Sequence, residues 1–333
     1  MAEVKEIKQS VNELQITGTI GEINLQKETK EVELKRGDTT KKVTCDVISK
    51  KEFKNPSMTV KVERKDENGN VTNETLIDVE IVNYFNQNSK SLNDKNEVED
   101  NRNFKALETV MNEYKSGTRV QITTKSGAIE ENGYVGKDGQ WSSRIRINGQ
   151  YLTSNNVPEE DKADAKISGV IRSIRPEMKN DEETGRLFID FYMFNFRGET
   201  YPVTLVVESD LAPDVEDIYS NGDSCQFDVE LLTRRVGKVT TKKESAFGRR
   251  ESKIVEGYNV TELSVFGGDP VFEEENDYYI DMETMKTAMK ERDIMIEQRK
   301  KDKADKEKEK SSGSNRGLNR KGNTVTSTAD SPF

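Results

Sequence analysis

Residues 14–23 read LQITGTIGEI, and residues 165–174 read AKISGVIRSI. The two stretches align without a gap and share a pattern of isoleucines around one glycine, Gly18 in the first and Gly169 in the second. Alternating apolar residues predict half-buried strands, and a glycine inside a strand marks a point where it can bend sharply. The match indicates that two similar β units follow one another along the chain.

A second match lies further along both copies. Residues 114–122, YKSGTRVQI, align with residues 219–227, YSNGDSCQF, through a tyrosine, a glycine and a glutamine at the same positions. The first copy is longer between its two matches, so we expect insertions there: a polar excursion at about 50–73 and a helix at about 103–114, where apolar residues keep helical spacing. Two matches in the same order favour a duplicated domain over coincidence.

The second copy is compact, and its alternation predicts five strands, with a short helix or turn at 210–222 between the third and the fourth. The expected strands are 165–175, 186–196, 200–208, 224–235 and 254–266. Five strands with a helical connection after the third is the order of an OB-fold, a small Greek-key barrel that binds strands across its face and between its long loops.

In this order of strands and loops, residues 165–270, and more loosely 14–157, resemble the OB-fold single-stranded DNA-binding proteins, most like the phage-encoded kind. The resemblance implies a mainly β chain with two OB-like five-stranded Greek-key barrels in tandem. The divisions that we expect are 1–158 for the first barrel with its loop and helix insertions, 163–272 for the second, 273–310 for an acidic patch and a charged helix, and 311–333 for a disordered interaction tail.

The composition agrees with small domains and long polar loops. Of the 333 residues, 32% are hydrophobic and 34% are charged, which is lean in core residues. No apolar run approaches the roughly 20 residues that cross a bilayer, and the N-terminus has no apolar signal region, so we expect a soluble cytoplasmic protein, in the host cytoplasm if the source is viral. Cys45 and Cys225 are each expected as small buried residues rather than as a disulfide.

The sequence argues against an enzyme. It contains no histidine, which removes the commonest general base and the commonest transition-metal ligand. Two cysteines are too few for a structural zinc site, and the glycine-rich phosphate loop, the dinucleotide motif and the nucleophile elbow are all missing from the sequence. We expect no catalysis, no metal and no cofactor, and a two-metal site built from the many carboxylates is the alternative.

The strongest local charge lies in residues 231–253, LLTRRVGKVTTKKESAFGRRESK. In a chain of net charge -10, such a basic stretch predicts a polyanionic partner, with single-stranded nucleic acid as the first candidate. Phe247 is a candidate for stacking on a base at the expected loop tip, and the alternative is a solvated hairpin tip. The candidate phosphate-binding cations are Arg234, Arg235, Lys238, Lys242, Lys243, Arg249, Arg250 and Lys253. In the OB-fold resemblance this loop falls between strands four and five, where such proteins often hold their ligand.

Residues 186–198, RLFIDFYMFNFRG, predict a strand that is apolar on both faces. A barrel fills only its inner face, so the second face must either be covered by a neighbouring element or stay available for base stacking. The residues that we single out on this second face are Phe188, Tyr192, Phe194 and Phe196, with Arg186 and Arg197 bracketing the strand as candidate phosphate contacts.

The first copy carries weaker basic signals. Lys51, Phe53 and Lys54 place an aromatic ring inside a basic loop, which would extend the binding groove. Arg144 and Arg146 alternate with isoleucines and predict an exposed basic stripe on a strand, whereas the single tryptophan nearby is expected in the core.

Beyond residue 281 a charged run without proline or glycine predicts a helix with a thin stripe of methionines and Ile296. We expect this stripe to pack on the barrels or on a partner, and the alternative is a single helix that is mostly exposed to solvent. The chain ends in Asp330, Pro332 and Phe333, which resemble the acidic tip of bacterial single-stranded DNA-binding proteins. There the terminal Phe and its carboxylate dock on replication and repair enzymes, and a chance ending is the alternative.

These observations predict a non-enzymatic protein that binds single-stranded DNA without strong sequence preference in replication, recombination or repair, and that recruits enzymes through its C-terminal tail. The resemblance to the phage-encoded kind also implies a bacteriophage source, and self-association is a further alternative. The alternatives are a structural or assembly protein that uses the aromatic barrel faces for protein contacts, and an RNA-binding OB protein.

Overall fold

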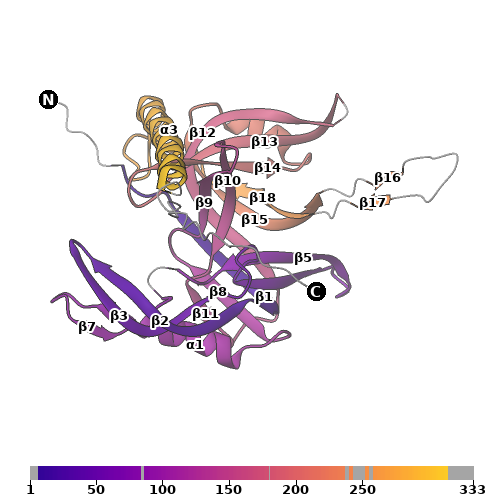
Figure 1. The fold of residues 1–333 in the computed structure, drawn as a ribbon. Coiled ribbons are helices and arrows are strands. Elements are labelled where there is room, and N and C mark those ends of the chain that lie inside the picture. Colours follow the sequence, from indigo (N-terminus) through magenta and orange to yellow (C-terminus); the bar gives the residue numbers. More distant parts are fainter. Residues whose placement is uncertain are drawn as a thin grey trace, which may run out of the picture.

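The computed structural model describes residues 7–83, 86–179, 181–236, 240–242, 252–254 and 258–313, with side chains described in these ranges outside 234–259 and 309–313. The fold is mainly β, and within the described residues twelve strands join in one large sheet that runs through two lobes (Figure 1). We refer to β1–β11 as the first unit and to β12–β18 as the second unit.

The elements of the first unit are β1 Asn12–Ile23, β2 Leu25–Arg36, β3 Thr39–Lys50, β4 Met58–Lys65, β5 Val71–Glu80, β6 Lys90–Leu92, β7 Val98–Asp100, α1 Arg102–Glu113, β8 Arg119–Thr124, β9 Ile129–Val135, β10 Trp141–Asn148 and β11 Tyr151–Thr153. Those of the second unit are β12 Lys162–Lys179, β13 Glu182–Phe194, β14 Thr200–Val207, α2 Ala212–Ile218, β15 Ser224–Val236, β16 Thr240–Lys242, β17 Ser252–Ile254 and β18 Tyr258–Gly268. Helix α3, Met282–Gly313, follows.

The second unit closes its strands into a ring. β12 pairs with β13, β13 with β14, β14 with β18, β18 with β15, and β15 again with β12, and the β14–β18 pair is parallel. The short helix α2 lies between the third and fourth strands of the ring, as the sequence predicts. Alternate side chains point inward, and Phe191 and Phe227 meet edge to face with ring centroids 5.5 Å apart.

The first unit has the same pairing order with a broken last strand. β1 pairs with β4 and β8, β4 with β5, β5 in parallel with β10, and β8 with β11. β10 continues into β11 through Gly149 and Gln150, and the Thr124 hydroxyl joins the two by donating to the Asn148 carbonyl at 2.6 Å and accepting from Gln150 N at 3.2 Å. The first unit therefore closes through two successive strands, β10 and the short β11, where the second unit uses β18 alone.

The insertions of the first unit fall partly outside the predicted positions. The helix expected at 103–114 is α1. The polar excursion expected at 50–73 is found only in part, because strand β4 and the beginning of β5 interrupt it and pair with each other, and a longer insertion is the β2–β3 hairpin. That hairpin contains many charged residues, so the alternation of apolar and polar residues is too weak to predict its two strands from the sequence.

The repeated sequence adopts repeated geometry. A Cβ on Gly18 would overlap the Lys61 carbonyl oxygen, and a Cβ on Gly169 would overlap that of Tyr192, so each strand crosses its neighbour at a distance only glycine allows. Each ring repeats one turn as well, because Gly117 N donates to the Ile20 carbonyl at 2.8 Å and Gly222 N donates to the Ile171 carbonyl at 2.7 Å. Both of these turn glycines have positive φ, 88° and 100°.

The two units share buried contacts. β1 pairs antiparallel with β12, which makes the sheet continuous from one unit to the other. Asn12 Nδ2 donates to the Ile129 carbonyl at 2.7 Å and to the Tyr201 hydroxyl at 3.0 Å, and that hydroxyl donates to the same carbonyl at 2.8 Å. Burial raises the pKa of Tyr201, so the phenol remains a neutral donor in this link.

Helix α3 packs across both units (Figure 1). Met285 and Ala288 lie in one buried cluster with Tyr192, Phe194 and other residues of the second unit. Towards the first unit, Arg292 pairs with Glu131 at 2.6 Å, and Lys303 Nζ donates to the Val135 carbonyl at 2.8 Å. The predicted methionine stripe is thus docked on the protein's own sheet.

Two smaller expectations concern cysteines and membranes. Cys45 and Cys225 are both buried free thiols, as predicted. Among the described residues, no helix is long and apolar enough to cross a membrane.

The glycine crossing gives a stability prediction. We expect Gly169→Ala to lower the free energy of unfolding by roughly 1–3 kcal/mol, because the added methyl must displace the β13 backbone. Gly267→Ala on β18 is the control, since its Cβ would meet Asp228 atoms only at ordinary contact distances of 3.5 and 3.6 Å. Urea unfolding of both variants measures the difference, and equal stability of the two would contradict the role of the crossing.

Candidate nucleic-acid interface

A groove of about 640 Å³ lies between the two units. It is formed by the loop between β3 and β4, by residues of β5 and β10, and by the beginning of β18. Thr233 on β15 donates to the Leu76 carbonyl on β5 at 2.6 Å and joins the units beside it. The lining residues are Lys54, Asn55, Pro56, Asp78, Glu80, Ser143, Arg144, Ile145, Arg146, Ile147, Val260 and Thr261.

The loop at one side of the groove is held by Asn24. Its side-chain amide donates to the Glu52 and Pro56 carbonyls at 2.9 and 3.1 Å, and its carbonyl oxygen accepts from Glu52 N at 3.0 Å. Lys50 pairs with Glu80 at 2.8 Å with both side chains largely buried, and Ser57 donates to the other oxygen of Glu80. These contacts fix both ends of the loop, so its central residues are presented at defined positions.

The loop exposes an aromatic ring between cations. The Phe53 side chain is 89% exposed, and the Lys50 ammonium lies 5.5 Å from the centroid of its ring. Lys51 and Lys54 are also exposed and form no ion pair with any described residue. An exposed ring beside unpaired cations is the combination that stacks a base and contacts its phosphates.

Strand β10 contributes the opposite side of the groove. Arg144 is exposed and forms no ion pair with any described residue, whereas Arg146 pairs with Glu130 at 3.0 Å. Arg144 is therefore the cation on this strand that stays available to an anionic ligand. Trp141, expected in the core, is only partly buried and lies under the Arg299 guanidinium of α3.

The groove also contains carboxylates. Glu80 is committed to Lys50 and Ser57. Burial in the groove raises the pKa of Asp78, the nearby Arg144 charge opposes the rise, and Glu80 adds to it. Part of the Asp78 side chain nevertheless remains exposed. Asp78 and Glu80 were not among the residues predicted from the sequence, and the alternation of apolar residues in 75–80 was the signal that could have placed both carboxylates on one face of a strand.

The aromatic face of β13 requires a correction. Stacking is wrong for Tyr192 and Phe194, which are 5% and 1% exposed, because α3 covers them. Phe196 is 70% exposed in the β13–β14 turn with the Arg197 guanidinium 5.1 Å from its ring. Phe188 is half-buried under Arg175, at 4.9 Å.

Arg186 is also placed differently from the prediction. Its guanidinium is largely buried and pairs with Glu177, Glu208 and Glu262 at 3.1 to 3.4 Å. Three carboxylates already balance its charge, so the predicted phosphate contact is wrong. No described residue of the second unit other than Val260 and Thr261 reaches the groove.

The basic stretch begins next to the groove. β15 and β18 pair from Phe227 with Gly268 to Val236 with Tyr258, and Val260, opposite Arg234, lines the groove. The strands β16 and β17 extend this hairpin away from the body (Figure 1). The backbones of Arg234, Arg235, Lys242 and Lys253 are described without their side chains, whereas Lys238, Lys243, Phe247, Arg249, Arg250, Asp330, Pro332 and Phe333 lie outside the described residues.

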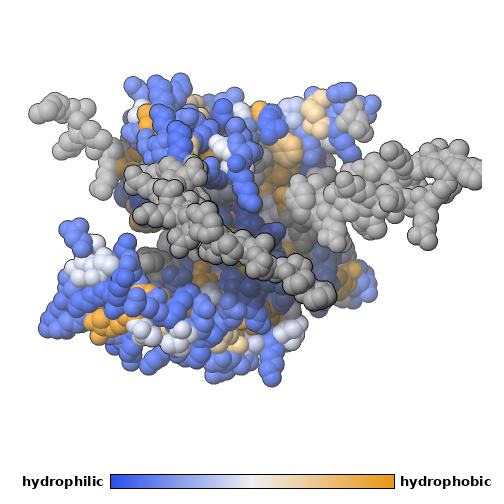
Figure 2. Space-filling model, in the orientation of Figure 1, coloured by the Kyte–Doolittle hydropathy of each residue, from blue (hydrophilic) through white to orange (hydrophobic). Residues whose placement is uncertain are grey.

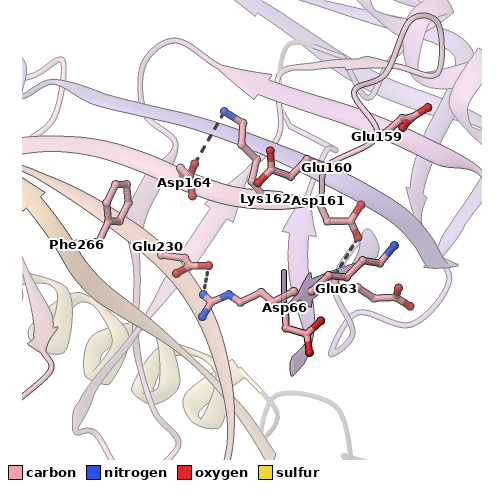
Figure 3. A pocket seen from close by; sticks show the side chains of 11 residues that line it. Glu63, Asp66, Glu159, Glu160, Asp161, Lys162, Asp164, Glu230 and Phe266 are labelled. Carbon is pink, nitrogen blue, oxygen red and sulfur yellow. Dashed lines mark hydrogen bonds and ion pairs between the residues drawn. The ribbon is translucent and has the colours of Figure 1, made fainter. Parts of the chain in front are cut away.

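A second cavity of similar size, about 640 Å³, is acidic (Figure 3). Glu63, Asp161, Asp164 and Glu230 line it together with the exposed ring of Phe266, and the remaining members include Glu159, Glu160 and Asp66. Arg64 pairs with Glu230 and Lys162 lies 3.9 Å from Asp164, so much of the basic charge there is already paired. This cavity repels a polyanion, and the groove at Phe53 is the better candidate.

The rest of the visible surface gives no stronger candidate. Figure 2 shows one face on which hydrophilic side chains predominate and apolar ones occupy small areas. Among the described residues, no group of three His, Cys, Asp or Glu side chains is placed to hold a metal ion.

The fold and the groove define a mainly β protein with one large sheet and a partly basic groove, bordered by a loop that exposes the aromatic ring of Phe53. The chain belongs to the YorF family, whose model matches residues 10–302. A search of curated proteins found no match.

Two solved structures are similar in part. One is the wild-type single-stranded DNA binding protein from Thermus aquaticus, with a TM-score of 0.45 and 9% identity, covering 81% of this chain and 97% of that chain. The other is a deletion mutant of that protein, with a TM-score of 0.44 and 10% identity, covering 81% of this chain and 99% of that chain.

Phe194 and Phe196 provide a test of the corrected aromatic face. We expect Phe194→Ala to lower the free energy of unfolding by roughly 3–5 kcal/mol, because loss of the ring leaves a cavity beneath α3. Phe196→Ala, on an exposed turn, should change it by no more than roughly 0.5 kcal/mol. Chemical unfolding distinguishes them, and a small loss for Phe194→Ala would mean that α3 does not cover this face in solution.

Proposed function

We propose that the protein binds single-stranded DNA in the groove between its two units. The observation that carries this proposal is the groove itself, which gathers Lys54 and Arg144, two cations unpaired among the described residues, from distant parts of the sequence, next to the loop residue Phe53 with its exposed ring. The cations provide attraction for phosphates and the ring provides a stacking surface, and neither contact depends on base identity.

We further propose that the two units are tandem OB barrels at 1–158 and 163–272. The support is the pairing order, in which strand one pairs with strands two and four, and strands three and five are parallel. OB-folds bind oligonucleotides on the face of strands two and three and through the loops after strands one and four. In this arrangement the loop of Phe53 lies between strands one and two of the first barrel, after the β2–β3 hairpin, and the basic stretch 231–253 begins at the end of strand four of the second.

The strand would then pass from one barrel to the other. Lys51, Lys54 and Arg144 contact phosphates, and Phe53 stacks on a base. The basic stretch extends the same surface, since its hairpin starts at Val260 in the groove. We propose that Arg234, Arg235, Lys242 and Lys253 add phosphate contacts there, together with the cations beyond the described residues.

A structural or assembly role through the aromatic barrel face has less support. Tyr192 and Phe194, the rings that such a role requires, are already covered by α3 of the same chain. RNA remains the nearer alternative, and a matched RNA oligonucleotide belongs in each binding experiment. A role in replication or recombination, with enzymes recruited by Asp330, Pro332 and Phe333, is part of the same proposal and rests on the tail sequence alone.

Salt dependence tests the groove. We expect the triple variant Lys51→Ala, Lys54→Ala, Arg144→Ala to weaken oligonucleotide binding and to flatten the slope of log affinity against log salt by about 2, at about 0.7 per lost phosphate contact. Phe53→Ala should weaken binding by roughly 1–3 kcal/mol and leave that slope unchanged, because stacking releases no counterions. Fluorescence anisotropy at several salt concentrations measures both quantities.

The control removes the same charge elsewhere. Lys286, Lys290 and Lys306 are exposed on α3, and their triple alanine variant should keep the wild-type slope. If this control flattens the slope as much as the groove variant does, the effect is general charge and the site lies elsewhere.

A further inference from the structure

One carboxylate in the groove, Asp78, makes no hydrogen bond or ion pair with the described residues, although the Arg144 charge lies near it. Asp78 and Glu80 are two residues apart on β5, and both line the groove. Glu80 uses one oxygen for Lys50 and the other for Ser57. Asp78 makes no hydrogen bond and no ion pair with any described residue, so both of its oxygens remain open acceptors.

An acceptor in this position limits what a bound strand can place against it. A phosphate is repelled by an ionised carboxylate, so the backbone of the strand must follow the nearby cations Lys54 and Arg144. The space at Asp78 then receives a base, and Ile145 and Val260 supply apolar surface beside it. The base must turn a hydrogen-bond donor towards the carboxylate, because an unpaired polar atom in a closed contact is costly.

Bases differ in the donors they offer. In a single strand the Watson–Crick edges are accessible. Cytosine presents its N4 amino group, which carboxylates accept in known base recognition, whereas thymine presents the O4 carbonyl at the corresponding position. An ionised Asp78 accepts a hydrogen bond from the cytosine amino group and repels the thymine carbonyl oxygen.

We propose, on the basis of the function proposed above, that Asp78 reads the edge of one base and makes the groove favour an amino-bearing base, cytosine first, over thymine. This adds a base preference to a surface whose phosphate and stacking contacts have none. Partial desolvation in the groove raises the pKa of Asp78 and the Arg144 charge opposes the rise, while the residue stays exposed and open to a ligand.

The test compares oligo-dC and oligo-dT of equal length at neutral pH. The quantity is the ratio of the dissociation constant for oligo-dT to that for oligo-dC, measured by anisotropy for the wild type and for Asp78→Asn. We expect this ratio to fall by about fivefold or more in Asp78→Asn, since a base-edge contact contributes discrimination of that order and an amide both donates and accepts. Asp78→Ser, which removes the carboxylate without replacing its shape, should lower the ratio as well.

Glu74→Gln is the matched control. Glu74 lies four residues before Asp78 on β5, on the same side of the strand but outside the groove, where it pairs with Lys61 at 3.5 Å. The Glu74→Gln variant removes one negative charge, as Asp78→Asn does. It should strengthen or preserve binding of both oligonucleotides without changing the ratio of their dissociation constants.

Two other results overturn the inference in different ways. If both oligonucleotides bind but the ratio is the same in the wild type and in Asp78→Asn, or falls equally in Glu74→Gln, Asp78 does not read a base and the proposed function stands. If the wild type binds neither oligonucleotide nor a mixed-sequence strand, the proposed function fails and the base preference fails with it.

Discussion

The structure depends on two close approaches between neighbouring strands, that of β1 to β4 in the first unit and that of β12 to β13 in the second. At Gly18 and Gly169 the backbone passes so near to a neighbouring carbonyl that a Cβ would overlap it. The register of both strand pairs shifts two or three residues later, between Ile20 and Glu22 and between Ile171 and Ser173. A bend and a bulge at this point let one long strand pair on both sides and close the ring. The same long strands, β1 and β12, also pair with each other, and this pairing joins the two units whose residues line the groove.

A second constraint is the surplus of apolar surface on β13. One side of that strand fills the ring, and the other side would expose Tyr192 and Phe194 to water. The methionine stripe of α3 covers them, and the same helix reaches the first unit through Arg292 and Glu131. Because the contact at Glu131 lies on β9, next to β10, the helix also supports the strand that carries Arg144.

Much of the fold could be predicted from the sequence, because period-two alternation and the two glycine matches are local signals. The main strands of the second unit follow from these signals, and helix α1 follows from the helical spacing of apolar residues at 103–114. The β2–β3 hairpin could not be found in this way, since its outward faces are charged on both strands.

The candidate site was predicted in part. Basic residues at Lys54 and Arg144 were identified, but their meeting in one groove, the commitment of Arg186 to three carboxylates and the covering of Phe194 all depend on contacts between residues far apart in the chain. Such contacts leave no mark on local spacing.

The most direct test of the central claim is to map where a bound strand touches the protein. Ultraviolet cross-linking of a single-stranded oligonucleotide to the full-length protein, followed by mass spectrometry of the linked peptides, reports the contact without any substitution. If the groove holds the strand, cross-links fall on the peptide containing Phe53 and on the peptide containing residues 143–147 of β10. Cross-links confined to the exposed rings of Phe196 or Phe266, with none on the Phe53 loop, would contradict it.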